Sequence, residues 1–157
     1  MNIVIESATM NDYDAVNLIV NEGQEEHAEA LPDFFKKVDR AMPQSYFREV
    51  LEDPRSEILI AKATEEIVGF AVMELKESPP FDSLVRREFV YLNDFGIKNN
   101  YHRNGIGKVL FDACVVWTKR NEATSIELNV WEFNKKAIAF YENYGMESLS
   151  RKMILRF

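Results

Sequence analysis

The chain has 157 residues, which is the usual size of a single domain and enough to bury a hydrophobic core. Hydrophobic residues make up 46% and charged residues 29%, which is the composition of a globular protein and not of a disordered one. The net charge of −7 argues against a general nucleic-acid binder, which would normally be basic because phosphate contacts supply most of its affinity.

Three further features predict the cellular setting. No apolar run approaches the roughly 20 residues that span a bilayer, so we expect no membrane partner. The N-terminal stretch "MNIVIESATMND" is acidic and alternates like a strand, unlike a signal or transit peptide. Cys114 is the only cysteine, which excludes an internal disulfide and fits a reducing compartment. We therefore expect a cytoplasmic protein with a single domain over residues 1–157.

The first part of the chain predicts a strand and three helices. The alternation of Ile3 and Ile5 with polar or small residues is typical of a strand, and a helical spacing of apolar residues follows it. Because proline disfavours helix in the residue before it, the third helix should stop before Pro54. The expected elements are a strand at residues 2–8, a helix at residues 9–24 capped by Thr9 or Asn11, a short helix after Pro32 and a helix at residues 44–53.

The second part of the chain predicts mainly strands. Gly96 interrupts a strand pattern, and an isolated glycine there often marks a bulge. Asn134 is a typical helix cap, and Gly145 is typical of the position just past a helix end. The expected elements are a hairpin of strands at residues 56–63 and 67–76, a strand at 87–99, a helix at 106–117, a strand at 124–133, a helix at 135–144 and one or two strands at 146–157. This order predicts an α/β fold with a mixed sheet.

A small basic turn precedes the helix expected at residues 106–117. In "YHRNGIGKVL", residues 101–110, two glycines stand at the helix start together with Arg103 and Lys108. A helix N-terminus offers unpaired N–H groups and a partial positive charge, and glycine lets a bulky anion approach the backbone. The turn therefore predicts a phosphate-binding site.

Two common phosphate motifs fit this turn poorly. A P-loop requires glycine five positions before its Gly-Lys pair and serine or threonine after it, where this chain has His102 and Val109. A dinucleotide-binding turn requires a third glycine where this chain has Leu110, although the acidic Glu127 lies about twenty residues on. The dinucleotide interpretation and a helix cap without any ligand both remain open.

The turn resembles a motif of the GCN5-related N-acetyltransferase (GNAT) family. That family carries arginine or glutamine, two variable residues, glycine, a variable residue and then glycine or alanine between its fourth strand and third helix. "HRNGIG" matches both glycines and departs at His102. "LNVWEFNKKAIAFYENYGM", residues 128–146, resembles the next strand and helix of the family. The likeness covers roughly residues 56–157, whereas the earlier residues fit in element order only.

The resemblance implies a mixed, mostly antiparallel central sheet flanked by helices on both faces, which is the acyl-CoA N-acyltransferase fold. It implies an enzyme with acetyl-CoA as the donor and no metal, in which a primary amine attacks the acetyl group directly in a ternary complex. A bulge would splay the fourth strand from the fifth, and the main chain there would pair with the pantetheine arm and polarise the thioester. The residues implied to hold acetyl-CoA are Phe95, Gly96, Ile97, His102, Arg103, Asn104, Gly105, Ile106, Gly107, Lys108, Asn134, Lys136 and Tyr141.

Acetyl transfer needs an acid for the leaving thiolate and a route for the protons of the amine. Tyr141 aligns with a tyrosine that many family members place beside the coenzyme sulfur as the acid, although it also shares an apolar helix face. Many relatives carry a glutamate base where this chain has Asn93, which cannot take a proton. Asp94 is the neighbouring candidate, although alternation should turn it to the other face, and Glu88 or a water relay stays open. Cys114 lies on an apolar helix face and is interpreted as a packing residue.

The acceptor is less defined by the sequence. In the family, the region around His27 forms one wall of the acceptor cleft, and we expect such a helix here instead of a metal site, because the sequence holds no second ligand cluster. Glu25, Glu26, Glu29 and Asp33 would give this wall a negative field, which favours a cationic amine only weakly. A polyamine, an amino-acid-like metabolite, an antibiotic amine and a protein amine all stay open, and a homodimer is compatible with each. The rival hypothesis is a catalytically weak acetyl-CoA-binding regulatory module.

Overall fold

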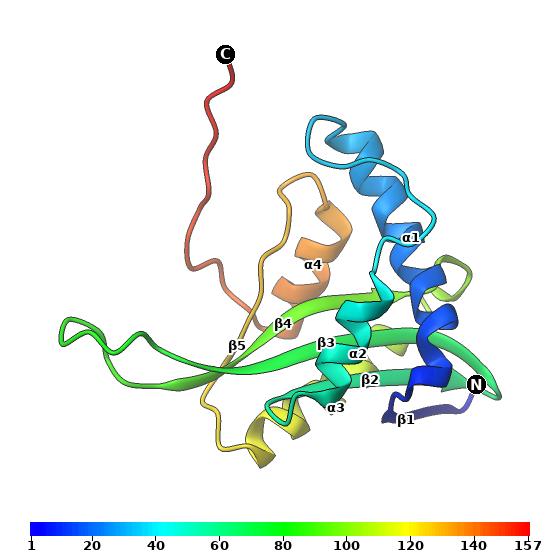
Figure 1. Cartoon of the computed structure of the whole chain (residues 1–157), viewed down its shortest axis with the longest axis horizontal. Helices are drawn as coiled ribbons and strands as arrows, with labels where there is room; N and C mark the ends of the chain where they lie inside the picture. The colour runs from blue at the N-terminus through cyan, green and yellow to red at the C-terminus, as the bar shows by residue number, and fades with distance from the viewer.

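The computed structural model describes residues 1–157 and arranges them as one open sheet with helices on both faces (Figure 1). The strand order is β1-β2-β3-β4-β5, and all neighbouring strands are antiparallel except the parallel pair β4 and β5. The strands are β1 (Ile3–Ser7), β2 (Ser56–Ala63), β3 (Glu66–Glu77), β4 (Glu88–Ile97) and β5 (Ile126–Glu127). The helices are α1 (Tyr13–Ala30), α2 (Gln44–Glu52), α3 (Ile106–Arg120) and α4 (Lys135–Tyr144), with short 3₁₀ turns η1 (Met10–Asp12) and η2 (Asn99–Tyr101). The expected mixed, mostly antiparallel sheet is confirmed.

Two apolar cores lie on opposite faces of the sheet. Helices α1 and α2 cover one face, where Phe47 and Phe70 belong to a cluster of 11 buried residues. Helices α3 and α4 cover the other face, where Met73 and Phe111 belong to a cluster of 12 buried residues. Successive side chains of a strand point to opposite faces, so β3 contributes to both clusters and is buried continuously over residues 68–73.

The ends of α4 follow directly from the sequence. The Asn134 side-chain oxygen accepts the Ala137 N–H at 3.1 Å, which satisfies one of the free donors at the helix start. Gly145 ends the helix with a φ of 117°, a left-handed conformation that glycine adopts without steric cost. Both predicted ends of this helix are therefore confirmed.

The segment after α1 differs from its prediction. Helix α1 continues to Ala30, and the N–H groups of Phe34 and Phe35 both donate to the Leu31 carbonyl in a turn. The short helix expected after Pro32 is therefore wrong. Side chains of α1 hold the segment instead: Asn21 donates to the Asp39 carbonyl at 2.8 Å, and Gln24 donates to the Lys36 carbonyl at 3.1 Å. These bonds satisfy carbonyl groups that a helix would have paired within itself.

The last two predicted strands also differ. The strand expected at residues 124–133 is reduced to the two residues of β5. The strand expected at residues 146–157 is absent, because the chain leaves α4 at Gly145 and runs away from the sheet (Figure 1). We call residues 147–157 the C-terminal tail. None of its backbone groups makes a backbone hydrogen bond with the rest of the chain.

The bulge in β4 lies three residues before the glycine at which it was expected. Val72 of β3 pairs with Asp94, and the next residue, Met73, pairs with Leu92. Asn93 is therefore the extra residue on β4. At such a bulge the alternation of successive side chains between the two faces of the sheet is interrupted.

Gly96 has a different role from the expected bulge. It pairs regularly with Phe70 of β3. A Cβ atom at Gly96 would lie 2.9 Å from the Phe70 ring and 3.2 Å from a methyl group of Ile19. The missing side chain thus lets α1 pack closely against the sheet, and the predicted bulge at this residue is wrong.

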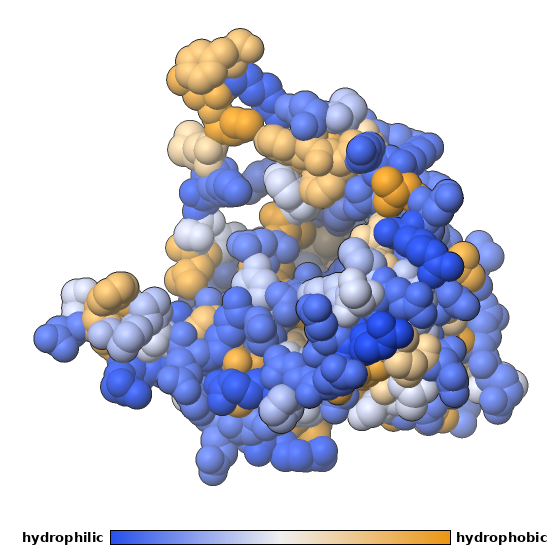
Figure 2. All heavy atoms as spheres, in the orientation of Figure 1, coloured by the Kyte–Doolittle hydropathy of each residue, from blue (hydrophilic) through white to orange (hydrophobic).

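The surface seen in Figure 2 is mainly hydrophilic, in keeping with the net charge of −7. Hydrophobic side chains gather at the free end of the C-terminal tail in this view. Among the helices, none combines the length and the apolar character that crossing a membrane requires.

Candidate active site

The start of α3 is a tight turn with two left-handed residues. Gly105, the N-cap of the helix, has a φ of 77°, and Arg103 has a φ of 66°. A Cβ atom at Gly105 would meet nothing within 4 Å, so the backbone conformation and not lack of space calls for glycine. No group of the chain accepts the N–H groups of Ile106, Gly107 and Lys108. The turn therefore presents free donors at the positive end of a helix, which suits an anion.

Side chains tie this turn to the end of β4. The Nε2 atom of His102 lies 2.8 Å from the Ile97 carbonyl oxygen, and since a carbonyl only accepts, Nε2 carries the hydrogen. Asn104 donates its side-chain amide to the Tyr101 carbonyl at 3.3 Å. The His102 ring thus positions the turn, a contact that the sequence did not indicate.

The second glycine of the motif serves helix packing. A Cβ atom at Gly107 would lie 3.1 Å from the Phe140 ring of α4. Helix α3 and helix α4 therefore approach each other closely beside the turn. Gly107 is required for this contact whether or not an anion is bound.

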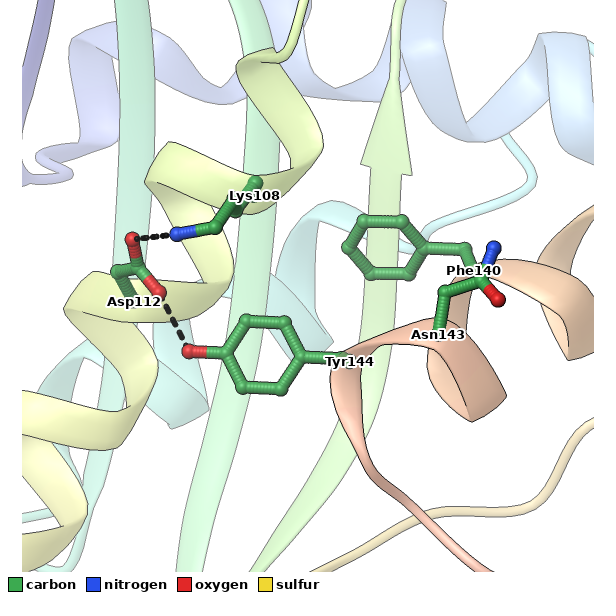
Figure 3. A pocket seen from close by; sticks show the side chains of 5 residues that line it. All are labelled: Lys108, Asp112, Phe140, Asn143 and Tyr144. Atoms are coloured by element: carbon green, nitrogen blue, oxygen red, sulfur yellow. Dashed lines mark hydrogen bonds and ion pairs between the residues drawn. The ribbon is translucent and has the colours of Figure 1, made fainter.

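A recess of about 450 Å³ opens between α3 and α4 next to the turn (Figure 3). Lys108 donates to Asp112 at 3.0 Å, and the Tyr144 hydroxyl donates to the other oxygen of the same carboxylate. The two donors hold the pKa of Asp112 below its usual range, while burial and the Asp112 carboxylate raise the pKa of Tyr144 to about 12. The Lys108 side chain is exposed, so this ion pair can exchange for another anion at little cost. Asp112 and Tyr144 were not singled out by the sequence.

Two cations of the predicted donor site have no acidic partner. Arg103 and Lys136 are exposed, and neither makes an ion pair within the chain. Asn134 lies at the start of α4, where its side-chain oxygen already caps the helix. The predicted donor-site residues of α3 and α4 thus include two unpaired cations besides the free N–H groups of the turn.

Strands β4 and β5 separate at the bulge. They pair only at Val90 with Ile126 and at Tyr91 with Glu127, and the bulge at Asn93 lies two residues beyond Tyr91. The separation that the sequence associated with a bulge is therefore present, with the bulge at a different residue.

Beyond the bulge, part of the β4 backbone faces the side from which β5 has departed. The Lys98 N–H donates to the Val68 carbonyl of β3 at 2.8 Å. Backbone groups of successive residues point to opposite edges of a strand, so Gly96 also faces β3, whereas Phe95 and Ile97 face the open side. Of the three predicted pantetheine contacts, two are therefore directed into the gap.

The bulge turns the Asp94 side chain toward α1 and α2. Its partner Val72 belongs to the core cluster on that face, and directly opposed residues share a face. Asn93 lines a recess on the same face, so the expected separation of these two side chains is wrong. Burial raises the pKa of Asp94 to about 6, although the Phe95 N–H, which donates to its Oδ1 at 3.0 Å, opposes the shift.

Tyr141 lies in an aromatic cluster on the α3 and α4 face. Its ring centre is 5.4 to 6.3 Å from those of its neighbours Phe95, Phe111 and Phe140. Burial raises the pKa of Tyr141 well above that of a free phenol, and the negative charge of Asp94 adds to the shift. The phenol therefore keeps its proton, and it lies close enough to Asp94 for the carboxylate charge to contribute to its raised pKa.

Comparison with known proteins identifies the family of this chain. The family described as "Acetyltransferase (GNAT) family" matches residues 24–146. The chain belongs to the GNAT acetyltransferases. It is 27% identical over 143 residues to the uncharacterized N-acetyltransferase YhfO of Bacillus subtilis (strain 168), covering 91% of this chain and 89% of that one. It is also 27% identical over 99 residues to the L-ornithine N5-acetyltransferase NATA1 of Arabidopsis thaliana, covering 62% of this chain and 42% of that one.

Two solved structures share the fold. A tetramutant of the BH1408 protein from Bacillus halodurans superposes with a TM-score of 0.95 at 27% identity, over 98% of this chain and 99% of that one. The aminoglycoside N-acetyltransferase AAC(6')-Iy in complex with CoA superposes with a TM-score of 0.71 at 14% identity, over 99% of this chain and 95% of that one.

This acetyltransferase has a second recess, of about 250 Å³, on the α1 and α2 face. The recess is lined by Tyr46, Glu49, Val50, Asp53, Ser56, Glu74 and Asn93. Burial raises the pKa of Tyr46, and the charges of Asp94 and Glu74 raise it further. The sequence analysis missed this set, although Tyr46, Glu49 and Asp53 recur at helical spacing and so share one face of α2.

The wall expected near His27 is aromatic as well as acidic. The His27 ring packs 5.0 Å from Phe35 and 5.4 Å from Phe133 between ring centres, and burial lowers its pKa. Trp131 packs against Phe35 at 5.2 Å. Glu25, Glu26 and Glu29 are exposed, while Asp33 accepts a hydrogen bond from Arg156 at 2.8 Å. The His27 side chain therefore stabilises the contact between the end of α1 and the loop after β5.

Proposed function

We propose that this acetyltransferase moves the acetyl group of acetyl-CoA to a primary amine, which attacks directly in a ternary complex. The observation that carries the proposal is the position of Asp94 and Tyr141. They come from opposite faces of the sheet to the point where β4 leaves β5, and the charge of one acts on the other.

The residues around the gap suit the shape and charge of acetyl-CoA, which would supply an acetyl thioester there. The free N–H groups of residues 106–108 suit its phosphates, and Arg103 and Lys136 add unpaired positive charge. The open-edge backbone groups of Phe95 and Ile97 suit an extended amide-bearing chain, as in strand addition. The Ile97 N–H is the better donor, because the Phe95 N–H already donates to Asp94.

Asp94 has the properties of a base for the acceptor. With a pKa of about 6 it is mostly ionised at neutral pH, yet basic enough to take a proton from an attacking amine directly or through one water. Protonation of Asp94 would also weaken its hold on the Phe95 N–H and free that donor for developing negative charge. Asn93 then needs no catalytic role, because the neighbouring carboxylate occupies the same face.

Tyr141 has the properties of the matching acid. Its raised pKa keeps the phenol protonated over the whole working pH range. Such a phenol is a weaker acid than a thiol, so transfer of its proton to the leaving thiolate is aided when Asp94 takes a proton from the amine, since the lost charge no longer raises the pKa of Tyr141. Cys114 is fully buried and burial raises its pKa to about 12, so direct attack by the amine is favoured over a thioester intermediate on the chain.

The acceptor favoured by the structure is a small amine with a second positive charge. Glu49, Asp53 and Glu74 line the recess beside Asn93, on the face toward which Asp94 is turned. Carboxylates grouped around a concave site raise the local concentration of cations. Two of the similar proteins are named for L-ornithine and for aminoglycosides, which are both amines with additional amino groups.

A coenzyme A release assay with a panel of amines tests the proposal. We expect turnover with diamines and amino sugars, and much less with neutral primary amines of the same length. We also expect acetyl-CoA to raise the melting temperature by mass action, by more than ATP or NADH at equal concentration. No stabilisation by millimolar acetyl-CoA would contradict the proposal, and stabilisation without turnover on any amine would favour a regulatory module.

A further inference from the structure

Two tyrosine hydroxyl groups make no hydrogen bond within the chain. The chain has six tyrosines, and four of their hydroxyls bond to other groups of the chain, namely those of Tyr13, Tyr91, Tyr101 and Tyr144. The remaining two are Tyr46 and Tyr141. Burial raises the pKa of each, and the negative charge of Asp94 raises it further. The two free phenols therefore lie near the same carboxylate.

These two phenols come from opposite faces of the sheet. Tyr141 packs against the core cluster of the α3 and α4 face, and Tyr46 packs against that of the α1 and α2 face. Tyr46 is only partly buried and lines the second recess together with Glu74 and Asn93. A polar group that finds no partner in the chain bonds to water or to a ligand. A ligand in this recess is therefore the natural partner of the Tyr46 hydroxyl.

Glu74 is the carboxylate of the recess whose charge acts on Tyr46. It lies on β3 two residues beyond Val72, the direct partner of Asp94, so Glu74 and Asp94 are diagonal neighbours on one face of the sheet. The Lys76 ammonium lies 3.4 Å from the Glu74 carboxylate, and both side chains are partly exposed. An ion pair of this kind is weak, so the ammonium group of a ligand can replace Lys76 at little cost.

The register of β3 and β4 sets the distance between the two carboxylates. Diagonal neighbours in an antiparallel pair lie roughly 7–8 Å apart between Cα atoms. An acceptor with one nitrogen at Asp94 and the other at Glu74 needs a similar distance between its nitrogens. An extended chain of about four or five methylene groups provides this distance, since a C–C bond is about 1.5 Å long.

We propose that Tyr46 and Glu74 bind the second ammonium group of a diamine acceptor and thereby select diamines by their length. The inference rests on the proposed acetyl transfer, with the reacting amine at Asp94. The Tyr46 hydroxyl oxygen accepts a hydrogen bond from the second ammonium, and the Glu74 carboxylate pairs with its charge. Asp53 also lines the recess, but its carboxylate already accepts the Ser56 hydroxyl at 2.7 Å.

A series of terminal diamines tests the selection by length, with coenzyme A release as the readout. Over the series from diaminoethane to diaminooctane, kcat/KM of the native protein should be highest for diaminobutane and diaminopentane. Butylamine, which lacks the second ammonium, should be at least about tenfold poorer than diaminobutane, as expected for the loss of a charged hydrogen bond. If the native protein acetylates no amine, the proposed function itself fails. If it acetylates amines without this optimum, only the selection by length is overturned.

Two variants test the residues assigned to the second ammonium. Tyr46→Phe keeps the ring and should raise the KM for diaminobutane about tenfold, with kcat and the KM for acetyl-CoA nearly unchanged. Glu74→Gln should remove the advantage of diaminobutane over butylamine. Native length preference in the Glu74 variant, or a Tyr46 variant that loses kcat at unchanged KM, would overturn the assignment. An equal loss with butylamine and with diaminobutane would indicate a structural effect and would overturn it as well.

Two matched variants control for the loss of a hydroxyl and of a charge elsewhere. Tyr101→Phe removes a hydroxyl that bonds to Glu66, outside the recess. Glu77→Gln removes a charge from β3 that pairs with Arg55 and does not line the recess. Both variants should keep the native order of preference among the diamines. A change in this order as large as that caused by Glu74→Gln would show that the selection does not come from the recess.

Discussion

The two faces of the sheet offer different kinds of chemical groups to a ligand. The α3 and α4 face offers backbone groups: a helix start without acceptors, a left-handed glycine and an open strand edge. The α1 and α2 face offers side-chain charges: Asp94 with its raised pKa, and three carboxylates around a recess. A site that binds through backbone groups tolerates few changes of backbone conformation, whereas the specificity of a site that binds through side chains can be altered by single substitutions. We call the α3 and α4 face the proposed donor face and the α1 and α2 face the proposed acceptor face. Activity should be lost abruptly on mutation of the donor face and should change gradually on mutation of the acceptor face.

The largest effect is expected on the donor face, at Gly105. Gly105→Asp should abolish detectable acetyl-CoA binding, because it adds a side chain and a negative charge beside the free N–H groups of the turn. Calorimetric titration measures the loss. Gly105→Asn is the matched control, since asparagine tolerates this conformation and adds no charge, and it should keep part of the affinity. Normal binding by the aspartate variant would show that the anion binds elsewhere.

The next largest effect is expected at Tyr141, which lies at the gap between β4 and β5. Tyr141→Phe should lower kcat by about 10²–10⁴-fold, the usual contribution of a general acid, and leave acetyl-CoA affinity nearly unchanged because the ring remains. Tyr144→Phe removes a hydroxyl from the same aromatic cluster and should leave kcat within about threefold, since Tyr144 bonds only to Asp112. Equal turnover in the two variants at every pH would remove the role assigned to Tyr141.

The pH dependence of activity and of stability should reveal the role of Asp94 on the acceptor face. Activity should fall as the pH drops through about 6, because the carboxylate becomes protonated, and Asp94→Asn should lose this limb together with about 10²-fold in kcat. The raised folded-state pKa makes ionisation of Asp94 destabilising, so stability falls as pH rises from the unfolded value near 3.8 to about 6. Asp94→Asn should therefore be more stable than the native chain above pH 6 and equal to it below pH 4. A stability difference of opposite sign, measured by urea unfolding, would contradict the assigned pKa.

The smallest effect is expected at His102. His102→Ala removes one exposed hydrogen bond to the Ile97 carbonyl and should weaken acetyl-CoA binding by no more than about tenfold, as expected for a single neutral hydrogen bond. The effect should appear in KM for acetyl-CoA and leave kcat unchanged. A loss as large as that of Gly105→Asp would mean that the ring itself contacts the donor.

The sequence predicts the donor face better than the acceptor face for a physical reason. Gly105, Asn134 and Gly145 act through local backbone conformation, which is encoded within a few neighbouring residues. Their predicted places as helix cap or helix end are confirmed. The contact of Gly107 with Phe140, in contrast, joins two helices and has no local signal.

The acceptor face depends on long-range pairing. The bulge lies at Asn93 because of how β4 registers with β3, and this register decides which way Asp94 points. Tyr46 reaches the same recess from α2, an element distant in sequence. The strand predicted at residues 146–157 is absent, because a strand also needs a neighbouring strand to pair with, and a local sequence pattern does not show whether one is available.

The burial of the single cysteine determines how the protein responds to oxidants. Coenzyme A, the product of the proposed reaction, is a thiol, and exposed low-pKa cysteines near such a product form mixed disulfides with it under oxidising conditions. Cys114 has no exposed surface, and burial raises its pKa to about 12, so almost no thiolate is present for exchange. The enzyme should keep working through redox changes that inactivate thiol-dependent enzymes, because its single thiol is buried and takes no part in the proposed reaction.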